Sequence, residues 1–279
     1  MKKIRLEDVH RYSAVGDVHF LPNGREFLFV HKTIDRENNK YLSNIWSGDL
    51  STGKVTQLTR GDKDGSPVVD PEGKSLLFTS RREKDAKGTE LYLLQLGGGE
   101  SRLVKTLKGG FSSISWVDEG NILFTTKVAP GENPEKPAEE EPVEKRIYVI
   151  DKIPFVSNGS GFTENRISQL YTLNVETGKM KPLEAVKGDV QSVELSPDRK
   201  RAAIIVKEDA ERRPRWNNLY ILDLKGGSPE RIGDDSISVY ACVWASSDEL
   251  FVLGTDLAKG FPTNPYFNFV DLESNEMKP

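Results

Sequence analysis

Residues that could carry out nucleophilic catalysis are sparse in this sequence. Its three histidines, His10, His19 and His31, all lie within the first 31 residues, and a structural role in strands is the simpler interpretation for His19 and His31. A serine nucleophile of the elbow type needs Gly-x-Ser-x-Gly between a strand and a helix, with its histidine later in the chain. The segments around Ser112 and Ser160 lack one or both of these glycines. The sequence therefore predicts no catalytic triad within this chain.

The sequence also lacks the ligands of a metal or cofactor site. Cys242 is the single cysteine, and it falls in the apolar run 239–244, which favours a buried small side chain over a reactive thiol. A zinc site requires several spaced cysteine, histidine or carboxylate ligands. The run 62–65, Asp-Lys-Asp-Gly, starts like a calcium loop but lacks the further ligands, which indicates a turn. Neither a phosphate-binding loop nor a dinucleotide fingerprint is present, so no cofactor is predicted.

A recurring turn indicates the secondary structure of the chain. Five four-residue turns end at positions 24, 73, 120, 199 and 248, with spacings of 49, 47, 79 and 49 residues. Each turn lies between two short apolar runs, and its Pro, Asp, Asn, Ser or Gly residues favour a reversal of the chain. A period of about 40 to 50 residues built from short strands is typical of a β-propeller, in which each repeat is one four-stranded blade.

An aromatic residue in a later strand of each repeat follows almost the same spacing. Trp46, Tyr92, Tyr171 and Tyr220 are separated by 46, 79 and 49 residues. The fifth repeat is weaker, because Asn268 takes the aromatic position. Turns and aromatics both make the third repeat about 30 residues longer than the others. Two independent patterns therefore predict one insertion in that repeat.

These patterns predict an all-β protein, a β-propeller with five four-stranded blade units and a short helical segment at the N-terminus. We expect residues 1–12 to pack outside the propeller and residues 13–279 to form the blades. The expected blade limits are about 13–60, 61–108, 109–187, 188–235 and 236–279, with an insertion at 127–168.

Carboxylates placed across a central cavity, as in glycosidases on five-bladed propellers, are a further catalytic alternative. The inner-strand positions that can be assigned show no recurring acid, which disfavours this alternative. These positions are Ser192, Val193, Glu194, Phe20, Val69 and Trp116.

The insertion has two halves of different composition. Residues 129–142 are rich in proline and glutamate, which favours a mobile surface loop because such a segment buries little apolar surface. The second half carries the apolar runs 147–150 and 153–156 and a tight turn at 159–162. This half is expected to be ordered, and an excursion that carries aromatic residues is a candidate contact for a ligand or another domain.

Composition excludes several classes of partner. The chain has 39 Lys and Arg against 43 Asp and Glu residues, a net charge of −4, which argues against a nucleic-acid groove. The basic start, residues 1–8, has no apolar stretch after it, so no signal peptide is visible. No run approaches the roughly 18 apolar residues of a membrane helix. We therefore expect a cytoplasmic protein with neither nucleic acid nor membrane as a partner.

The repeats resemble those of a known family. Turns such as Ser196-Pro197-Asp198-Arg199 and Asp70-Pro71-Glu72-Gly73, followed by Leu-Tyr-x-Leu-x-Leu strands, are similar to the N-terminal propeller of prolyl oligopeptidase family serine peptidases. The acylaminoacyl-peptidase and dipeptidyl-peptidase branch resembles the chain most. The N-terminal segment 4–9 and the stretch 153–173 strengthen the resemblance. The likeness covers essentially the whole chain, whereas the turn motifs alone also occur in Tol-system propellers.

The resemblance implies a function that this chain does not perform alone. Members of the family have seven blades followed by an α/β-hydrolase domain that supplies serine, aspartate and histidine, whereas five repeats are visible here. The chain is therefore expected to be the non-catalytic, substrate-gating propeller portion of a peptidase that hydrolyses short peptides. Its partners would be its own C-terminal α/β-hydrolase domain and a short peptide. Peptide specificity and association into a homo-oligomer stay open.

The resemblance also implies that blade loops touch the substrate, and the ordered half of the insertion supplies the candidates. Phe155, Phe162 and Arg166 are the predicted substrate-binding residues, because the planar Arg guanidinium can bind a carbonyl or carboxylate. The simpler alternative is that both Phe residues pack the insertion while Arg166 pairs with Glu164 or faces solvent. A second functional alternative is a stand-alone propeller that acts as a binding platform for a protein or ligand.

Overall fold

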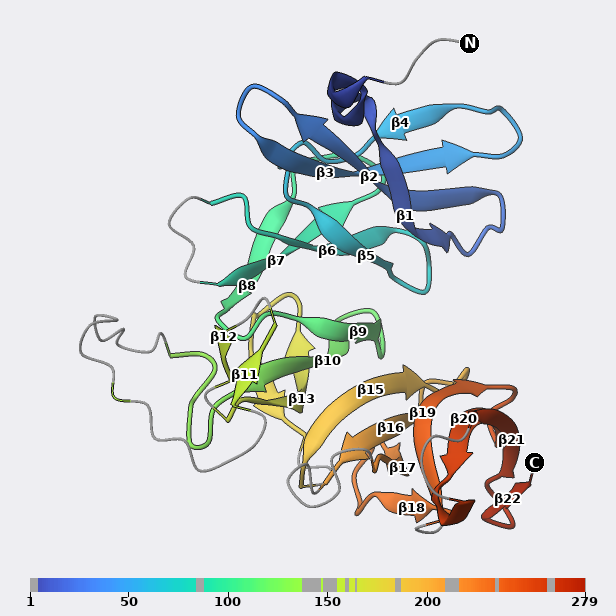
Figure 1. Cartoon of the computed structure of the whole chain (residues 1–279). Helices are drawn as coiled ribbons and strands as arrows, with labels where there is room; N and C mark the ends of the chain where they lie inside the picture. Colours follow the sequence, from blue (N-terminus) through green and yellow to red (C-terminus); the bar gives the residue numbers. More distant parts are fainter. Residues whose placement is uncertain are drawn as a thin grey trace. The chain divides into compact units, whose positions relative to one another are not determined.

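The computed structural model describes residues 5–83, 88–136, 147, 155–158, 161–163, 165–183, 187–208, 216–233, 236–259 and 264–278. Within these residues the chain forms five four-stranded antiparallel sheets, one short two-stranded hairpin and short 3₁₀ helices (Figure 1). The predicted fold class, five four-stranded units preceded by a short helical segment, is confirmed. That segment is the 3₁₀ helix η1 (Leu6–Arg11).

Each sheet follows the chain, so neighbouring strands in sequence are neighbours in space. The first sheet has β1 (Ala14–Phe20), β2 (Glu26–Asp35), β3 (Lys40–Asp49) and β4 (Val55–Gln57). The second has β5 (Gly65–Val69), β6 (Ser75–Ser80), β7 (Thr89–Gln95) and β8 (Arg102–Leu107). The third has β9 (Ser112–Trp116), β10 (Asn121–Val128), β13 (Ile167–Asn174) and β14 (Met180–Pro182), with the hairpin β11 (Val156–Ser157) and β12 (Gly161–Phe162) between β10 and β13.

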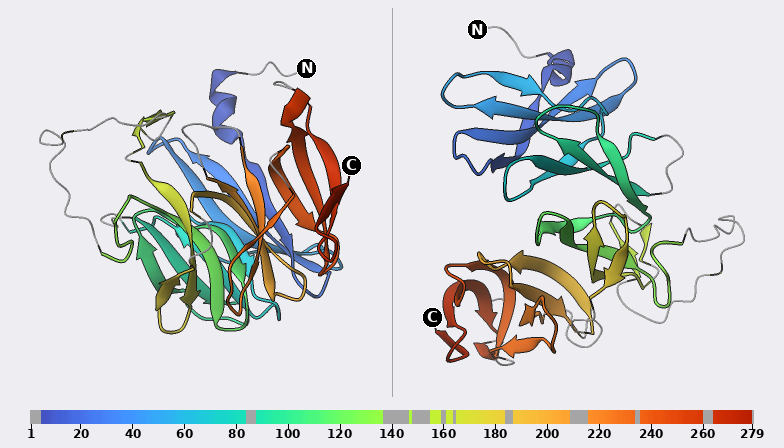
Figure 2. Two further views of the ribbon diagram at one scale, coloured as in Figure 1. Left: turned by 90° about the horizontal axis from the view of Figure 1, so that it is seen from below. Right: turned by 180° about the vertical axis from the view of Figure 1, so that it is seen from behind.

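The last two sheets are uninterrupted. The fourth has β15 (Asp189–Leu195), β16 (Arg201–Lys207), β17 (Asn218–Asp223) and β18 (Glu230–Ile232). The fifth has β19 (Ile237–Trp244), β20 (Glu249–Asp256), β21 (Tyr266–Asp271) and β22 (Glu276–Lys278), with the 3₁₀ turn η3 (Leu257–Lys259) after β20. The fifth repeat, weak in sequence, thus forms a complete sheet. Figure 2 shows the sheets in two further views.

The chain divides into two compact units. The N-terminal unit contains Met1–Phe111, Asp118–Gly120 and Asn174–Gly178, and therefore η1 and the first two sheets. The C-terminal unit contains Ser112–Val117, Asn121–Leu173 and Lys179–Pro279, and therefore almost all of the other three sheets.

The predicted turns are stabilised by hydrogen bonds that their own backbone and side-chain groups make. In the fourth sheet, the Arg199 amide donates to the Ser196 carbonyl at 2.8 Å, and the Ser196 hydroxyl donates to Asp198 Oδ1 at 2.7 Å. The latter bond is the main cause that lowers the pKa of the exposed Asp198 carboxyl. The equivalent Gly24 and Gly73 close their turns at positive φ, which glycine adopts without strain.

Apolar side chains between consecutive sheets form the core. In the N-terminal unit, Leu28, Val30 and Ile45 of the first sheet pack with Leu76 and Phe78 of the second, and all five are fully buried. In the C-terminal unit, the residues shared by the fourth and fifth sheets are the following: Ala203, Ile205, Leu219, Ile221, Ile232, Val239, Leu250, Val252 and Val270. The continuous apolar run 201–206 forms the central strand β16, which is covered on both faces.

The first strand of every sheet contains a β-bulge that the sequence patterns did not predict. Pairing shifts between Gly16 and His19 in β1, Gly65 and Val68 in β5, and at the matching places in β9, β15 and β19. The extra residues include Asp17, Ser66 and Ser113, which all have φ between 47° and 50°. A bulge re-aims the following side chains. The bulges recur with the period of the turns, so they belong to the repeat.

The bulges explain how two outward sheet faces remain apolar. Val15 and Phe20 pair with His31 and Phe27, so they lie on one face of the first sheet although they are an odd number of positions, five, apart in the sequence. That face is exposed, with Phe20 at 60%. It continues through the rings of Phe27 and Phe29, whose centroids are 5.9 Å apart. We call it the first outward face.

The fifth sheet has an equivalent surface, the second outward face. Its apolar residues share one side of the sheet by their pairing: Ala241, Val243, Phe251, Leu253, Phe267 and Phe269. Phe267 is 72% exposed, and the Phe251 and Phe269 rings meet edge to face at 5.7 Å. The opposite side of the same sheet is buried against the fourth sheet.

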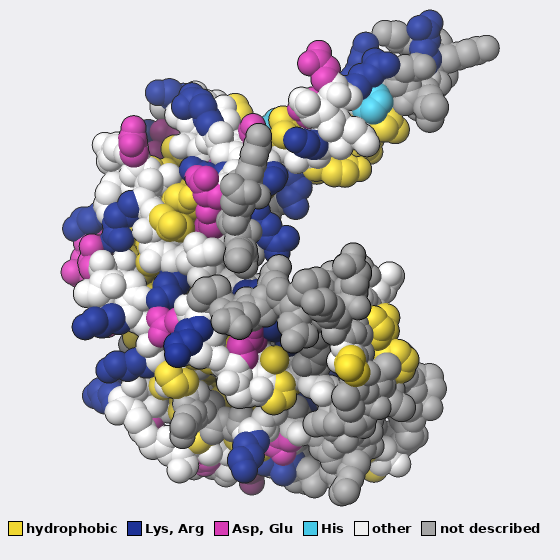
Figure 3. All heavy atoms as spheres, turned by 90° about the vertical axis from the view of Figure 1, so that its left-hand side faces the viewer, with side chains coloured by type: hydrophobic (Ala, Val, Ile, Leu, Met, Phe, Trp, Pro, Cys, Tyr) yellow, Lys and Arg dark blue, Asp and Glu magenta, His cyan; other side chains and the backbone are white. Residues whose placement is uncertain are grey.

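Other surface regions are strongly polar. Figure 3 shows Lys and Arg side chains interspersed with Asp and Glu, as expected for a chain of net charge −4. Within the described ranges, no helix has both the length and the apolar character needed to span a bilayer. The outermost strand of the fourth sheet starts at Glu230, directly after Pro229, which has no amide hydrogen for the ladder.

Candidate functional site

The insertion in the third sheet is closed at its base by an ion pair. Arg166 donates from Nη1 to Glu132 Oε2 at 2.6 Å and from Nη2 to Glu132 Oε1 at 2.9 Å. Nη1 also donates to the carbonyl oxygen of Lys127, near the end of β10, at 3.3 Å. The two side chains are only 17% and 15% exposed. We call this group, Arg166, Glu132 and the Lys127 carbonyl, the Arg166 brace.

Local turns hold both partners of the brace in place. The Glu132 amide donates to the Ala129 carbonyl at 3.0 Å, while the Ala129 amide donates to Glu132 Oε2 at 2.9 Å. On the other side, the Arg166 amide donates to the Thr163 carbonyl at 2.9 Å. Residues 129–136 thus form defined turns, and the rest of the loop predicted to be mobile, 137–142, lies outside the described residues.

The predicted aromatic candidates lie on the hairpin β11–β12. Val156 pairs with Phe162, and the Thr163 amide donates to the Phe155 carbonyl at 2.9 Å, so the candidates Phe155 and Phe162 are on facing strands. Their side chains are 43% and 45% exposed. Gly161 allows the tight turn through its φ of 74°. The structure therefore groups both aromatics on one small exposed element.

Arg166 lies at the foot of this hairpin, and its guanidinium is engaged with Glu132. Glu164, the partner considered from the sequence, lies outside the described residues. Sequence reasoning missed Glu132 because 34 residues separate the partners and no local motif connects them. The available signal was that both residues flank the same insertion. Substrate contact by Phe155, Phe162 and Arg166 stays a prediction.

The brace lies close to the recurring aromatic position of the third sheet. Tyr171 packs against Phe124 with ring centroids 5.9 Å apart. Burial raises the pKa of the Tyr171 hydroxyl, and the nearby negative charges of Glu132 and Glu135 raise it further. The base of the insertion thus lies near a residue of the regular repeat.

A second ion pair occupies a similar place in the second sheet. Arg82 Nη2 donates to Asp64 Oδ1 at 2.8 Å, and the Asp64 side chain has 0% exposure. Asp64 also accepts from the Ser80 hydroxyl at 2.7 Å and from the Gly61 amide at 2.9 Å. The Arg82 guanidinium stacks over the Tyr92 ring at 4.4 Å. We call these residues the Arg82 network.

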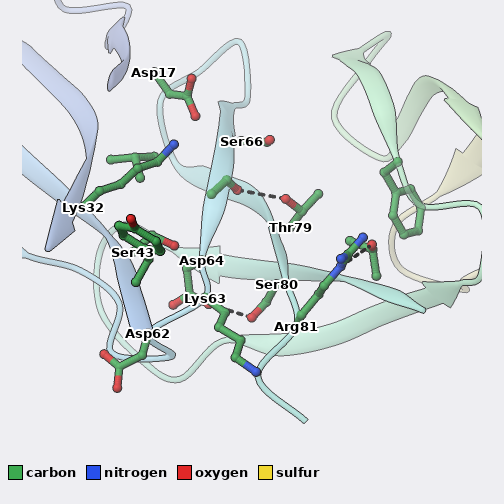
Figure 4. Close-up of a pocket in the computed structure, with 15 residues that line it drawn as sticks. Asp17, Lys32, Ser43, Asp62, Lys63, Asp64, Ser66, Thr79, Ser80 and Arg81 are labelled. Atoms are coloured by element: carbon green, nitrogen blue, oxygen red, sulfur yellow. Dashed lines mark hydrogen bonds between the residues drawn. The ribbon is translucent and has the colours of Figure 1, made fainter. Parts of the chain in front are cut away.

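The N-terminal unit contains a polar pocket beside this network. The pocket has a volume of about 460 Å³ (Figure 4). Asp17, Asp62 and Ser66 of its lining all have left-handed backbones, with φ between 49° and 60°. Lys32 also lines it, and its side chain extends toward Asp17 in Figure 4. The lining suits a small polar ligand. Of the run predicted as a turn, residues 62–64 lie in the loop that forms part of the wall, and Gly65 begins β5.

The described residues contain no group of three or more His, Cys, Asp or Glu side chains placed to hold a metal ion. Cys242 is partly buried and packs against the core of the fourth and fifth sheets, in agreement with its predicted role. Burial raises the pKa of its thiol to about 12. This thiol is therefore protonated and unreactive near neutral pH.

Comparison with known proteins identifies a peptidase among the relatives. No protein-family model matches the chain. The uncharacterized peptidase YuxL of Bacillus subtilis (strain 168) is 31% identical over 228 residues. The match covers 80% of this chain and 34% of that relative, so the chain spans about a third of the relative's length.

Solved structures share the fold at lower identity. An acylaminoacyl peptidase of Pyrococcus horikoshii has a TM-score of 0.71 and 16% identity, over 97% of this chain and 40% of that one. The β-propeller domain of the Trilobed protease from Pyrococcus furiosus has a TM-score of 0.62 and 15% identity, over 96% of this chain and 71% of that one. Together with the relative, these matches confirm the resemblance to the propeller part of such peptidases.

Proposed function

We propose that this chain is the non-catalytic, substrate-gating propeller portion of a serine peptidase that hydrolyses short peptides. The observation that carries the proposal is the 31% identity to a peptidase over 80% of the chain, which leaves most of that relative outside the match. The nucleophile, its histidine base and the oxyanion hole would belong to a C-terminal α/β-hydrolase domain. The propeller would admit short peptides to that domain and keep folded proteins out.

The distribution of catalytic residue types supports this division of labour. His19 and His31 are in β1 and β2, and the His31 ring packs edge to face against Trp46 at 5.8 Å. His10 lies in η1. All three histidines of the chain therefore have places in regular elements near its start, and none follows Ser112 or Ser160, the serines whose surroundings come nearest to a nucleophile elbow.

The two outward faces support the presence of further polypeptide against the chain. Large exposed apolar patches mark surfaces that another element covers. The chain covers 71% of the Trilobed protease propeller domain, which leaves length for about two more four-stranded sheets of this kind. We propose that additional blades cover the first and second outward faces in the intact protein.

A paired substitution tests these faces. Phe251→Ser with Phe267→Ser should make the 279-residue chain more soluble and lower the melting temperature of the full-length protein, since the face is exposed in one and covered in the other. Tyr41→Ser, which removes an exposed aromatic outside both faces, is the control and should change neither quantity. An unchanged full-length melting temperature in the double variant would contradict the coverage of this face.

The hairpin β11–β12 supplies the proposed contact with substrate. Phe155 and Phe162 are large apolar side chains that remain about half exposed on a short hairpin. Aromatic rings held in this way can pack against apolar side chains of a peptide. We therefore expect them to contribute to peptide binding in the intact enzyme.

The decisive experiment locates the nucleophile. The full-length gene product is treated with a fluorophosphonate probe, and the labelled residue is mapped by mass spectrometry. We expect a labelled serine outside residues 1–279, loss of activity on short peptides after labelling, and no hydrolysis of folded proteins. The 279-residue chain treated in the same way is the control and should stay unlabelled.

Two results would overturn the proposal. A labelled serine within residues 1–279 would place catalysis in the propeller. A gene that stops at Pro279, with no peptidase activity in its product, would favour the alternative of a stand-alone binding platform, for which the polar pocket in the N-terminal unit is the available site.

A further inference from the structure

We infer that the Glu132–Arg166 ion pair is a positioning device: it sets where the hairpin β11–β12 presents Phe155 and Phe162 to apolar side chains of a peptide. The inference rests on the proposed function and assigns Arg166 an indirect role. Arg166 would act through the hairpin, whereas the two aromatic side chains would touch the peptide.

The hydrogen bonds of the Arg166 guanidinium support an indirect role. Both terminal nitrogens of Arg166 donate to the two oxygens of one carboxylate, and Nη1 also reaches the Lys127 carbonyl. A bidentate Arg–carboxylate pair is directional, so it fixes the orientation of both partners. The donor edge of the guanidinium that would otherwise hold a peptide carboxylate is already used inside the protein.

The position of the ion pair in the chain shows that it closes the base of the insertion. The chain leaves the third sheet at Val128 and returns at Ile167, and the brace joins residues close to both points. Ordering so long an excursion costs conformational entropy, which a contact at its base reduces by closing the loop there. The Arg166 amide and the Thr163 amide then link the brace to the hairpin through consecutive backbone bonds.

Partial burial makes the pair sensitive to loss of one partner. With 17% and 15% exposure, each side chain has lost most of its solvent. Removal of one charge therefore leaves the other partly buried without its partner, which is costly. The hairpin, which is linked to Arg166 through Thr163, is the element that would shift.

The exposed surface of the hairpin indicates the class of ligand. Val156 and Phe162 pair directly, so they form an exposed apolar surface on one face of the hairpin, and the exposed Phe155 lies on the opposite face. Such a surface binds aromatic or aliphatic peptide side chains by removing apolar area from water. The substrate class is therefore a short peptide with an apolar residue that meets this hairpin.

Kinetics of the full-length enzyme separate this role from direct binding. Glu132→Gln and Arg166→Glu should each raise KM for short apolar peptides about tenfold, which corresponds to about 1.4 kcal/mol, with kcat within about twofold. The reversed pair, Glu132→Arg with Arg166→Glu, should recover most of the loss. Phe155→Ala should raise KM similarly, and the reversed pair should not rescue it.

A second, exposed ion pair serves as the control for the effect of losing an ion pair on KM. Glu176→Gln removes the partner of Arg102, an exposed pair of the N-terminal unit, and should leave KM unchanged. If Arg166 binds the substrate directly, Glu132→Gln will leave KM almost unchanged and the reversed pair will not rescue Arg166→Glu. That pattern would overturn the inference.

Limited proteolysis of the 279-residue chain tests the positioning role without peptidase activity. Glu132→Gln should speed cleavage within residues 155–163 several-fold, the reversed pair should restore resistance, and Glu176→Gln should have no effect. Equal cleavage rates in all variants would contradict positioning, whatever the enzyme assay shows. Absence of peptidase activity in the wild-type protein, together with the expected cleavage pattern, would instead contradict only the proposed function.

Discussion

The Arg82 network and the Arg166 brace use the same pair of charges for different purposes. Both lie near the recurring aromatic position of their sheet, Tyr92 in the second and Tyr171 in the third. Asp64 is completely buried and accepts from Arg82, Ser80 and Gly61, whereas Glu132 keeps 15% exposure and accepts from the Arg166 guanidinium and the Ala129 amide. The first ion pair is part of the core, and the second lies at its edge.

The difference in burial corresponds to a difference in what each pair fixes. Asp64 ties the loop that leads from the first sheet to the second, since its amide also donates to the Ser43 carbonyl at 3.0 Å. Glu132 and Arg166 tie the feet of an excursion that the sheet does not need for its own pairing. We conclude that the Arg82 network stabilises the fold, while the Arg166 brace places an exposed element.

The largest expected effect is on Asp64. Asp64→Ala removes the partner of a mostly buried Arg82 and leaves the Gly61 amide and the Ser80 hydroxyl without an acceptor. The free energy of unfolding should fall by about 3 to 5 kcal/mol, the range for breaking a buried ion pair. Urea unfolding followed by tryptophan fluorescence measures it. The control is the exposed neighbour Asp62→Asn, which should cost less than about 0.5 kcal/mol, and equal losses would remove the distinction in burial.

The second effect is the coupling within each pair. Double-mutant cycles should give about 3 kcal/mol for Asp64 with Arg82 and about 1 kcal/mol for Glu132 with Arg166, because the desolvated pair interacts more strongly. Chemical unfolding of the single and double alanine variants measures both values. A larger coupling for Glu132 with Arg166 would reverse our assignment of the two roles.

A third effect is on the pKa of Tyr171, which reports how close the Arg166 brace lies to it. Glu132→Gln removes a negative charge that raises the pKa of the Tyr171 hydroxyl, so this pKa should fall. It should stay above the value of an exposed tyrosine, because burial is the larger cause. Absorbance of tyrosinate near 295 nm reports the titration (a Tyr171→Phe variant identifies the contribution of this residue). A rise in the pKa would show that Glu132 does not act through its charge.

The smallest effect concerns Cys242, which lies far in sequence from both pairs. Its thiol has a pKa of about 12 in the folded chain against 9.0 for an exposed thiol, so the unfolded chain loses this proton first as pH rises. The thiol's contribution to stability is therefore complete below pH 9 and is lost between pH 9 and 12. Cys242→Ser should flatten this part of the stability profile. At pH 8, a thiol reagent should modify the wild-type chain only on unfolding.

Much of the fold could be predicted because its signals are local. Turns such as Ser196-Pro197-Asp198-Arg199 depend on neighbouring residues, and the spacing of Trp46, Tyr92, Tyr171 and Tyr220 follows one position of each third strand. The fifth sheet formed despite Asn268 because the apolar residues Val252 and Val270 on the same face retain the packing. Periodicity thus identified the sheets without any knowledge of their contacts.

The candidate site was harder to predict for a physical reason. The partnership of Glu132 and Arg166 spans 34 residues and depends on how the insertion folds back, which no local rule specifies. The bulges at Asp17, Ser66 and Ser113 were missed because these residues share a backbone conformation but no single residue type. Long-range partners and backbone irregularities are therefore the parts that required coordinates.

The extra residue in the first strand of each four-stranded sheet determines where the chain tolerates a single-residue deletion. In β1, Asp17 and Val18 together face Phe29, so removal of one of them would leave a regular ladder in which the pairs His19–Leu28 and Val15–His31 persist. In the regular strand β16, loss of any residue would turn every later side chain to the opposite face of the sheet. A single-residue deletion should thus be tolerated at the bulge of a first strand and rejected in the second strand beside it.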